Sequence, residues 1–271
     1  MLGQSSQITF LGTGTSVGVP VIGCNCEVCM SQDSKNKRLR SSIYVELAGI
    51  SFLIDAGPDI RQQSLRAGLT QLDAVLITHI HTDHIAGFDD LRAFCWRREI
   101  PLPIYSHQET LEKLSKTFHW GFGDTPYPGY LSVEANSVTK TFQLSPQVQV
   151  TPLLVEHGSV VTYGYRVDCF HHDLKIQSWA YISDVKNIST QTLEKMQNLD
   201  LLIIDGLRWV EHPSHFNIEQ AITLIDQLAL PQAYLTHISH EVEHNDLLSQ
   251  LPDYIKPAYD GLTVKLVKNN E

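Results

Sequence analysis

The sequence predicts a single α/β domain (α+β in some schemes) made of two packed sheets with helices on the outer faces. Each half of the chain begins with apolar segments of strand length, and these segments then alternate with helical patterns. No linker or low-complexity segment separates the halves, so we expect one domain over residues 1–271. With 42% hydrophobic residues, a chain of this length can form a full core.

In the first half, strands are expected where short apolar runs end at glycine or aspartate, and helices where apolar residues recur every three to four positions. The expected strands are 8–11, 42–47, 51–55, 72–77 and 104–105. The expected helices are 59–67, closed by Gly68, then 85–97 and 109–118. Residues 12–16 form a glycine turn without the lysine of a phosphate-binding loop. We interpret this turn as backbone that makes room for a neighbouring site.

The second half repeats the order of β-rich and then alternating segments. A loop rich in glycine, proline and aromatic residues, 119–130, precedes it. The expected strands are 148–155, 161–167, 178–182, 201–205, 233–236 and 262–266. The expected helices are 189–197, 217–228 and 245–250.

Composition and charge exclude several classes of protein. No apolar run approaches the length of about 20 residues that spans a bilayer. The first residues also lack the basic and long apolar regions of a secretory signal. We therefore expect a cytoplasmic protein with no membrane partner. The formal net charge of −10 argues against a nucleic-acid binder whose whole surface is basic.

A cluster of metal-binding residue types follows the expected strand 72–77, namely His79, His81, Asp83 and His84. Residues two apart in an extended chain point the same way, so His79 and His81 can bind one ion. Asp83 and His84 lie past the turn and should face a different point in space from His79 and His81. A polar surface loop would explain a single histidine, but four donors in this pattern predict a site for zinc, manganese or iron.

Three of the five cysteines lie within residues 24–29, in an insertion at about 20–40. An odd number of cysteines with this spacing, in an expected cytoplasmic protein, favours metal binding over disulfides. Cys95 and Cys169 stand alone among apolar or aromatic residues and are expected in the core. The same insertion carries a local basic group, which is either a solvated loop or a phosphate-steering element: Lys35, Lys37, Arg38 and Arg40.

Three donors in the second half share the local position of His79, directly after an apolar strand: His157, Asp184 and His237. Strand ends are rigid while the loops beyond them can vary, so functional groups are often placed there. Repetition of this context predicts that the three residues supply the remaining ligands of one metal cluster.

The order of donors along the chain resembles the metallo-β-lactamase superfamily: His79-x-His81-x-Asp83-His84, then His157, Asp184 and His237. The resemblance spans essentially the whole chain and implies a four-layer αββα sandwich of two mixed sheets, with a dinuclear metal site at its edge. By position, the first metal would be bound by His79, His81 and His157. The second would be bound by Asp83, His84 and His237, with Asp184 as the bridge. An aspartate at position 184 is typical of the phosphoester hydrolases of the superfamily.

Two further features resemble the phosphoribosyl 1,2-cyclic phosphate phosphodiesterase branch: the C-x-C-x-x-C segment and a histidine three residues after the last catalytic ligand. The resemblance implies one structural zinc, bound by Cys24, Cys26, Cys29 and His240. Three thiolates and one imidazole are also a common closed zinc set on chemical grounds. Members of this branch form dimers, so the resemblance also suggests a homodimer, in which this chain pairs with a second copy of itself.

The same branch, like the tRNA 3′-processing endonucleases, carries a histidine that is not a metal ligand between a strand and the next helix. His215 fits this position better than His212. The implied reaction is attack on phosphorus by a hydroxide activated at two divalent metals, with Asp83 orienting the nucleophile and His215 protonating the leaving group. Arg38, Arg40 and His212 are candidates for contacts with the substrate.

The leading hypothesis is a metal-dependent hydrolase, a phosphodiesterase acting on a small cyclic phosphate or nucleotide-like diester. One alternative is an RNA-processing nuclease of the tRNA 3′-endonuclease type, although the sequence has no glycine-rich, basic insertion that could serve as a tRNA-binding arm. A second alternative is a thioester hydrolase. A non-catalytic metalloprotein or a di-iron relative is disfavoured, because His81 stands where flavodiiron relatives need a carboxylate.

Overall fold

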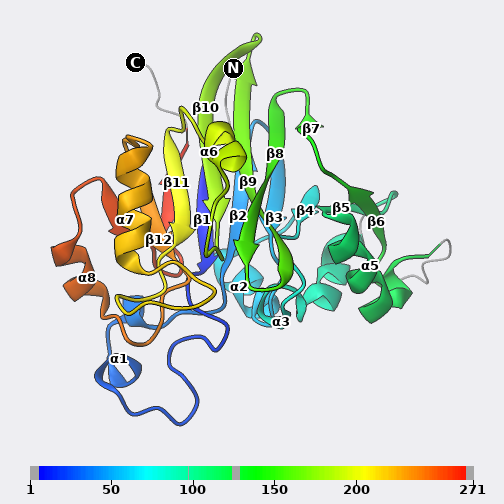
Figure 1. Ribbon diagram of the computed structural model, residues 1–271. Helices are drawn as coiled ribbons and strands as arrows, with labels where there is room; N and C mark the ends of the chain where they lie inside the picture. Colours follow the sequence, from blue (N-terminus) through cyan, green and yellow to red (C-terminus); the bar gives the residue numbers. More distant parts are fainter. Residues whose placement is uncertain (1–5, 97, 124–128, 267–271) are drawn as a thin grey trace.

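Two seven-stranded sheets stack face to face in the computed structural model, which describes residues 6–96, 98–123 and 129–266 (Figure 1). The first sheet has the order β14-β1-β2-β3-β4-β5-β6 and is antiparallel at β14, β1, β2 and β3 and parallel from β3 to β6. Its strands are β1 Gln7–Gly12, β2 Ser42–Leu47, β3 Ile50–Ile54, β4 Ala74–Leu76, β5 Leu102–Ser106, β6 Val133–Ser137 and β14 Thr263–Lys265.

The second sheet has the order β13-β12-β11-β10-β9-β8-β7, with parallel pairing from β10 to β13 and antiparallel pairing from β10 to β7. Its strands are β7 Phe142–Ser145, β8 Val148–His157, β9 Val160–His171, β10 Leu174–Ile182, β11 Leu201–Asp205, β12 Ala233–Thr236 and β13 Ile255–Pro257. Both sheets are therefore mixed, as predicted.

Helices cover the outer face of each sheet. An apolar cluster between the sheets takes buried side chains from both. A second cluster joins β10 to β13 with α6 Thr190–Lys195, α7 Ile218–Gln227 and α8 His244–Gln250. A third joins the first sheet with α2 Ile60–Ala67 and α5 Gln108–Thr117. The layers are thus helix, sheet, sheet and helix, which confirms the predicted αββα sandwich.

Most expected elements are present, but the predicted long helix 85–97 is wrong. The chain there forms α3 Thr82–Ile85, a 3₁₀ turn η2 Phe88–Leu91 and α4 Arg92–Cys95. The helix breaks at Gly87, where a Cβ would lie only 2.1 Å from the Gly57 carbonyl oxygen. Arg97 lies outside the described residues, as do residues 124–128 of the loop predicted at 119–130.

Several short elements were missed from the sequence because their apolar patterns are weak, namely β6, β7 and β13. Other short elements lie in loops: α1 Glu27–Met30, η1 Ser34–Asn36 and η3 His119–Gly121. Among the described residues, no helix is long and apolar enough to cross a membrane.

The parallel strands of both sheets end at one edge of the sandwich, and the predicted donors follow them. Thr78 and His79 come shortly after β4, Asp184 shortly after β10, and His237 directly after β12. Parallel strands in an open sheet bring their carboxyl ends together, so side chains from distant parts of the sequence meet there. This edge is the place where the fold positions a site.

Close backbone contact fixes α3, which carries Asp83 and His84, against the end of β3. The N–H of Ala56 donates to the His84 carbonyl at 2.8 Å, and the N–H of Gly87 donates to the Ala56 carbonyl at 3.0 Å. A Cβ on Gly57 would lie 2.0 Å from the carbonyl oxygen of Asp83. Only glycine allows this approach, so the sequence at position 57 sets the location of α3.

We expect Gly57→Ala to destabilise the protein by about 1–3 kcal/mol, because the added methyl group forces α3 away from β3. Gly123→Ala is a matched control, because a Cβ there meets no atom of the described residues within 4 Å. Chemical denaturation of both metal-free variants measures the difference. Equal stability of the two variants would contradict the close-approach explanation.

Candidate metal centre

A pocket of about 320 Å³ opens at the shared edge of the two sheets. Serine, glycine and valine residues form part of its wall. Six residues predicted from the sequence also line it: His81, Asp83, His157, Asp184, His215 and His237. The fold therefore brings donors from both halves of the chain into one cavity.

The first predicted set, His79, His81 and His157, converges closely. Nδ1 of His81 lies 2.9 Å from Nε2 of His79 and 3.2 Å from Nε2 of His157. The three ligand atoms lie within 4.8 Å of one another, as a single metal ion requires. His79 and His157 are buried.

The members of the second predicted set meet through Asp184. Nε2 of His84 lies 3.2 Å from Oδ2 of Asp83 and 3.2 Å from Oδ2 of Asp184. The other Asp184 oxygen, Oδ1, lies 3.5 Å from Nε2 of His237 and 3.8 Å from Nε2 of His157. Asp184 thus stands between the two sets, in the position expected of a bridging carboxylate.

Hydrogen bonds outside the pocket leave the inner nitrogens of three histidines free. Nδ1 of His157 lies 2.8 Å from the carbonyl oxygen of Ser214, which can only accept. Nδ1 of His84 lies 2.7 Å from Oδ2 of Asp55. The Thr78 hydroxyl donates to Asp55, so Nδ1 of His79, 2.9 Å away, must donate to that hydroxyl. In the neutral form of each ring, Nε2 therefore keeps its lone pair for a ligand.

The charge states suit metal binding. Burial holds the pKa of His79 well below its usual range, lowers that of His157, and lowers that of His237 to about 4, so these rings are neutral. Burial alone would raise the pKa of Asp184, but the surrounding histidines outweigh that effect and hold the pKa well below its usual range. Neutral imidazoles around an ionised carboxylate are the forms that bind divalent cations.

Two buried atoms indicate where a cation fits. Nε2 of His84 and Oδ2 of Asp184 are buried and lie 3.2 Å apart, but neither atom makes a hydrogen bond of good geometry with any described residue. Burial opposes a positive charge on His84, but Asp184, Asp55 and Asp83 raise its pKa well above the usual range. The position therefore attracts positive charge, and a divalent metal ion would satisfy both atoms.

Sequence reasoning missed two buried carboxylates that orient the pocket histidines. Asp55 accepts hydrogen bonds from the Thr78 backbone and hydroxyl and from His84. Asp205 lies 2.8 Å from Nδ1 of His215 and accepts from the backbone N–H of Val185 at 3.1 Å. Both follow or end an apolar strand, so the rule that identified Asp184 also applied to them.

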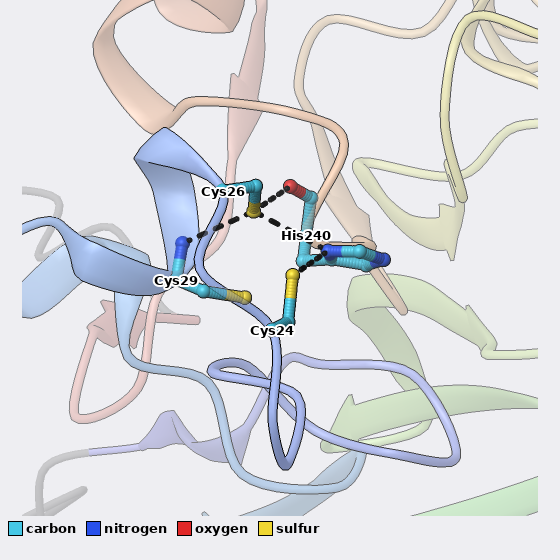
Figure 2. Close-up of side chains that lie close together, drawn as sticks. All are labelled: Cys24, Cys26, Cys29 and His240. Carbon is cyan, nitrogen blue, oxygen red and sulfur yellow. Dashed lines mark hydrogen bonds between the residues drawn. The ribbon is translucent and has the colours of Figure 1, made fainter.

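The cysteine segment and His240 form a second donor group (Figure 2), and none of its members lines the pocket. The Sγ atoms of Cys24 and Cys26 each lie 3.4 Å from Nδ1 of His240. Sγ of Cys29 completes a set whose atoms all lie within 4.8 Å of one another. The Cys29 backbone N–H, and then His240, lower the pKa of Cys26 to about 6, which favours the thiolate form that binds zinc.

Polar contacts attach the cysteine insertion to α8. Asn36 donates to Glu243 at 2.5 Å and accepts from the backbone N–H of His244 at 2.9 Å. Asn245 donates to Asp33 at 3.0 Å. Direct hydrogen bonds therefore hold the insertion on α8, in addition to the contacts of its cysteines with His240.

The predicted substrate contact at Arg38 is wrong. Arg38 is almost fully buried, and its guanidinium contacts the Thr13 hydroxyl at 2.8 Å, the Ala258 carbonyl at 2.6 Å and His244 at 3.2 Å. It therefore ties the insertion to the C-terminal part of the chain. Arg40 forms an ion pair with Asp59 at 3.2 Å and is not among the pocket-lining residues.

His212 lies beside the pocket histidine His215, with ring centroids 5.0 Å apart. Its side chain accepts from the backbone N–H of Ser214 at 3.3 Å. His212 is thus close to the site without lining the pocket. A contact with substrate stays a prediction for both His212 and Arg40.

If Arg38 is structural, Arg38→Met should lower the free energy of unfolding by roughly 2–4 kcal/mol, because it removes three buried hydrogen bonds. The number of bound metal ions should not change. Arg61→Met, on the exposed side of α2, is the control and should be near neutral. Chemical denaturation and metal analysis check both variants. Unaltered stability of Arg38→Met would contradict the structural role.

Comparison with known proteins finds both similar structures and similar sequences. A solved structure described as a new diphosphatase from the PhnP family superposes with a TM-score of 0.86 at 35% identity, covering 98% of this chain and 99% of that one. A Porphyromonas gingivalis protein named octanoyltransferase is 43% identical over 93% of this chain. The match spans only 50% of that protein's length, so its name does not assign an activity to the matched half.

A ribonuclease Z from Mycolicibacterium gilvum is 27% identical over 63% of this chain and 59% of its own length. The family model described as the beta-lactamase superfamily domain matches residues 51–238, a range that holds all the predicted catalytic ligands. The chain therefore belongs to the metallo-β-lactamase superfamily, whose hydrolase fold it shares.

Proposed function

We propose that this protein is a metal-dependent phosphodiesterase that cleaves a small cyclic phosphate or nucleotide-like diester. The observation that carries the proposal is the arrangement inside one pocket. Two sets of metal donors joined by Asp184 face His215, whose ring is held by Asp205. Such a pocket combines charge stabilisation with proton donation, as phosphodiester cleavage requires.

The ligand assignment comes from the resemblance to the superfamily, and the short distances between the donors support it. His79, His81 and His157 would hold one divalent ion, and Asp83, His84 and His237 the other, with Asp184 shared between them. When bound, such ions stabilise negative charge on phosphate oxygens and make water a better nucleophile near neutral pH. Zinc or manganese suits the imidazole and carboxylate ligands, and iron is also compatible.

His215 is suited to act as a general acid. Its Nδ1 lies 2.8 Å from Asp205, so the other nitrogen, Nε2, carries the proton that can be transferred. Burial opposes a charged ring, but the hydrogen bond to Asp205 raises the pKa of His215 above its usual value. The imidazolium therefore persists nearer to neutral pH and can protonate a leaving alkoxide. His157, Asp184 and His215 also lie within 4.8 Å, so His215 is near the reacting centre.

Asp83 has two roles in the proposal. Its carboxylate lines the pocket and lies 3.2 Å from His84, where it can contribute to the second ligand set. Burial opposes ionisation, but His84 outweighs it and holds the pKa of Asp83 below its usual value. An ionised carboxylate facing the pocket can also accept a hydrogen bond from the attacking water and orient it.

The structural relative described as a diphosphatase supports chemistry at phosphorus. The cysteine group supports the phosphoribosyl 1,2-cyclic phosphate phosphodiesterase branch, with a structural zinc bound by Cys24, Cys26, Cys29 and His240. The pocket volume of about 320 Å³ suits a small ligand rather than a polymer.

A nuclease of the ribonuclease Z type is the second candidate, favoured by the partial match to such a protein. The net charge of −10 weighs against it. Binding and cleavage of precursor tRNA at moderate salt separate the candidates. Specific cleavage of tRNA 3′ ends, without activity on cyclic phosphates, would favour the nuclease.

We expect the protein to bind two exchangeable ions and one tightly held zinc, and to hydrolyse bis(p-nitrophenyl) phosphate. Asp184→Ala and His81→Ala should lower this activity on the order of 10³-fold, because they remove ligands of the catalytic ions. Cys26→Ser should instead lose the tightly held zinc. Metal analysis and steady-state kinetics measure these effects.

The control for this experiment is His172→Ala, which alters an exposed histidine on the β9–β10 hairpin. It should keep all ions and full activity. If Asp184→Ala and His81→Ala kept wild-type hydrolysis, the proposed function would be wrong.

The role of His215 predicts a dependence on the leaving group. p-Nitrophenolate is a much weaker base than an alkoxide and leaves without protonation, whereas an alkoxide needs an acid. His215→Ala should therefore slow hydrolysis of a 2′,3′-cyclic nucleotide by roughly 10²-fold or more, and that of bis(p-nitrophenyl) phosphate much less. Comparison of kcat/KM for the two substrates tests this. An equal loss for both would exclude a role in protonating the leaving group.

A further inference from the structure

Ser41 joins the glycine turn of residues 12–16 to His237, the last ligand of the second set. Its hydroxyl lies 3.2 Å from Nδ1 of His237 and donates to the carbonyl of Gly14 at 3.0 Å. A hydroxyl has one hydrogen, so the ring nitrogen must donate to the serine oxygen. Nδ1 of His237 therefore carries the hydrogen, and Nε2 faces Asp184 with a free lone pair.

The backbone around this contact is held on both sides. The N–H of Ile238 donates to the Thr13 carbonyl at 2.9 Å, and the N–H of Gly14 donates to the Leu39 carbonyl at 2.8 Å. A Cβ on Gly14 would lie 2.9 Å from the Cβ of Arg38, so a larger residue would separate the turn from the segment that carries Ser41. His237 itself has a φ of 58°, a left-handed conformation that is uncommon for residues other than glycine.

We propose that Ser41 is a positioning residue that selects the tautomer of His237 able to bind the second metal. Ser41 and His237 are both buried, so water does not substitute for the hydroxyl. Without it, a hydrogen on Nδ1 has no partner, whereas a hydrogen on Nε2 can be donated to Oδ1 of Asp184, 3.5 Å away. Nε2, the atom that would bind the metal, then carries the hydrogen. The consequence for catalysis rests on the proposed dinuclear site, but the tautomer does not.

The test compares Ser41→Ala with Ser42→Ala in the full-length protein. Ser42 is a matched control, because it is equally buried and donates only to the Asp55 backbone carbonyl at 2.9 Å. Two-dimensional ¹⁵N–¹H NMR of metal-free protein reports the tautomer of His237, with its signals assigned by their loss in His237→Gln. Wild type and Ser42→Ala should show hydrogen on Nδ1, and Ser41→Ala should shift toward hydrogen on Nε2.

Zinc titration gives the second readout. Ser41→Ala should bind the second catalytic ion roughly 10- to 100-fold more weakly and leave the first unchanged, since loss of a partner that orients a ligand has effects of this size. Ser41→Cys, whose thiol is a weaker acceptor, should give an intermediate affinity and serves if Ser41→Ala fails to fold.

The proposal is overturned if Ser41→Ala keeps both hydrogen on Nδ1 and wild-type affinity for the second ion. It is also overturned if Ser42→Ala lowers the affinity for the second ion to the same extent, because the loss would then reflect a general disturbance of packing. A wild-type protein without phosphodiester hydrolysis would instead count against the proposed function, and the NMR measurement would still decide the role of Ser41.

Discussion

The imidazoles gathered at the edge of the sandwich must each find a partner for the nitrogen that faces away from the pocket. The rest of the site depends on this constraint. Asp55, the Ser214 carbonyl, Asp205 and Ser41 supply those partners from four different segments. A buried N–H without a partner costs about 1–3 kcal/mol, so these contacts select one orientation for each ring. The same contacts leave the inner nitrogens free for a metal.

The electrostatics follow from this geometry. Asp83, Asp184 and Asp55 concentrate negative charge around His84, and burial excludes the water that would otherwise screen it. Positive φ values at Asp55 and His237, 67° and 58°, show that the backbone is held in uncommon conformations at the strand ends. Strain of this kind persists only where surrounding contacts over-determine the structure, and here it coincides with the predicted ligands and their supports.

The rule that functional groups follow buried strands predicted much of the site. It placed His79, His157, Asp184 and His237 at one edge, because a strand is visible in sequence as an apolar run. It did not separate ligands from supporting groups, since Asp55 and Asp205 occupy the same sequence context. That distinction depends on which atom faces the cavity, and sequence patterns do not contain it.

The errors have similar physical causes. Arg38 stands in a basic run that appears solvent-exposed in sequence, yet three partners distant in the chain enclose it. The helix expected at 85–97 is interrupted because Gly87 packs on Gly57. The docking of the cysteine insertion on α8 was also not visible. Hydrogen bonds of Asn36 and Asn245 hold the insertion against the segment that carries His240, so this imidazole is kept at a high effective concentration beside the three thiols. A metal ion that used these four ligands would then require little ordering of the chain, which favours tight binding.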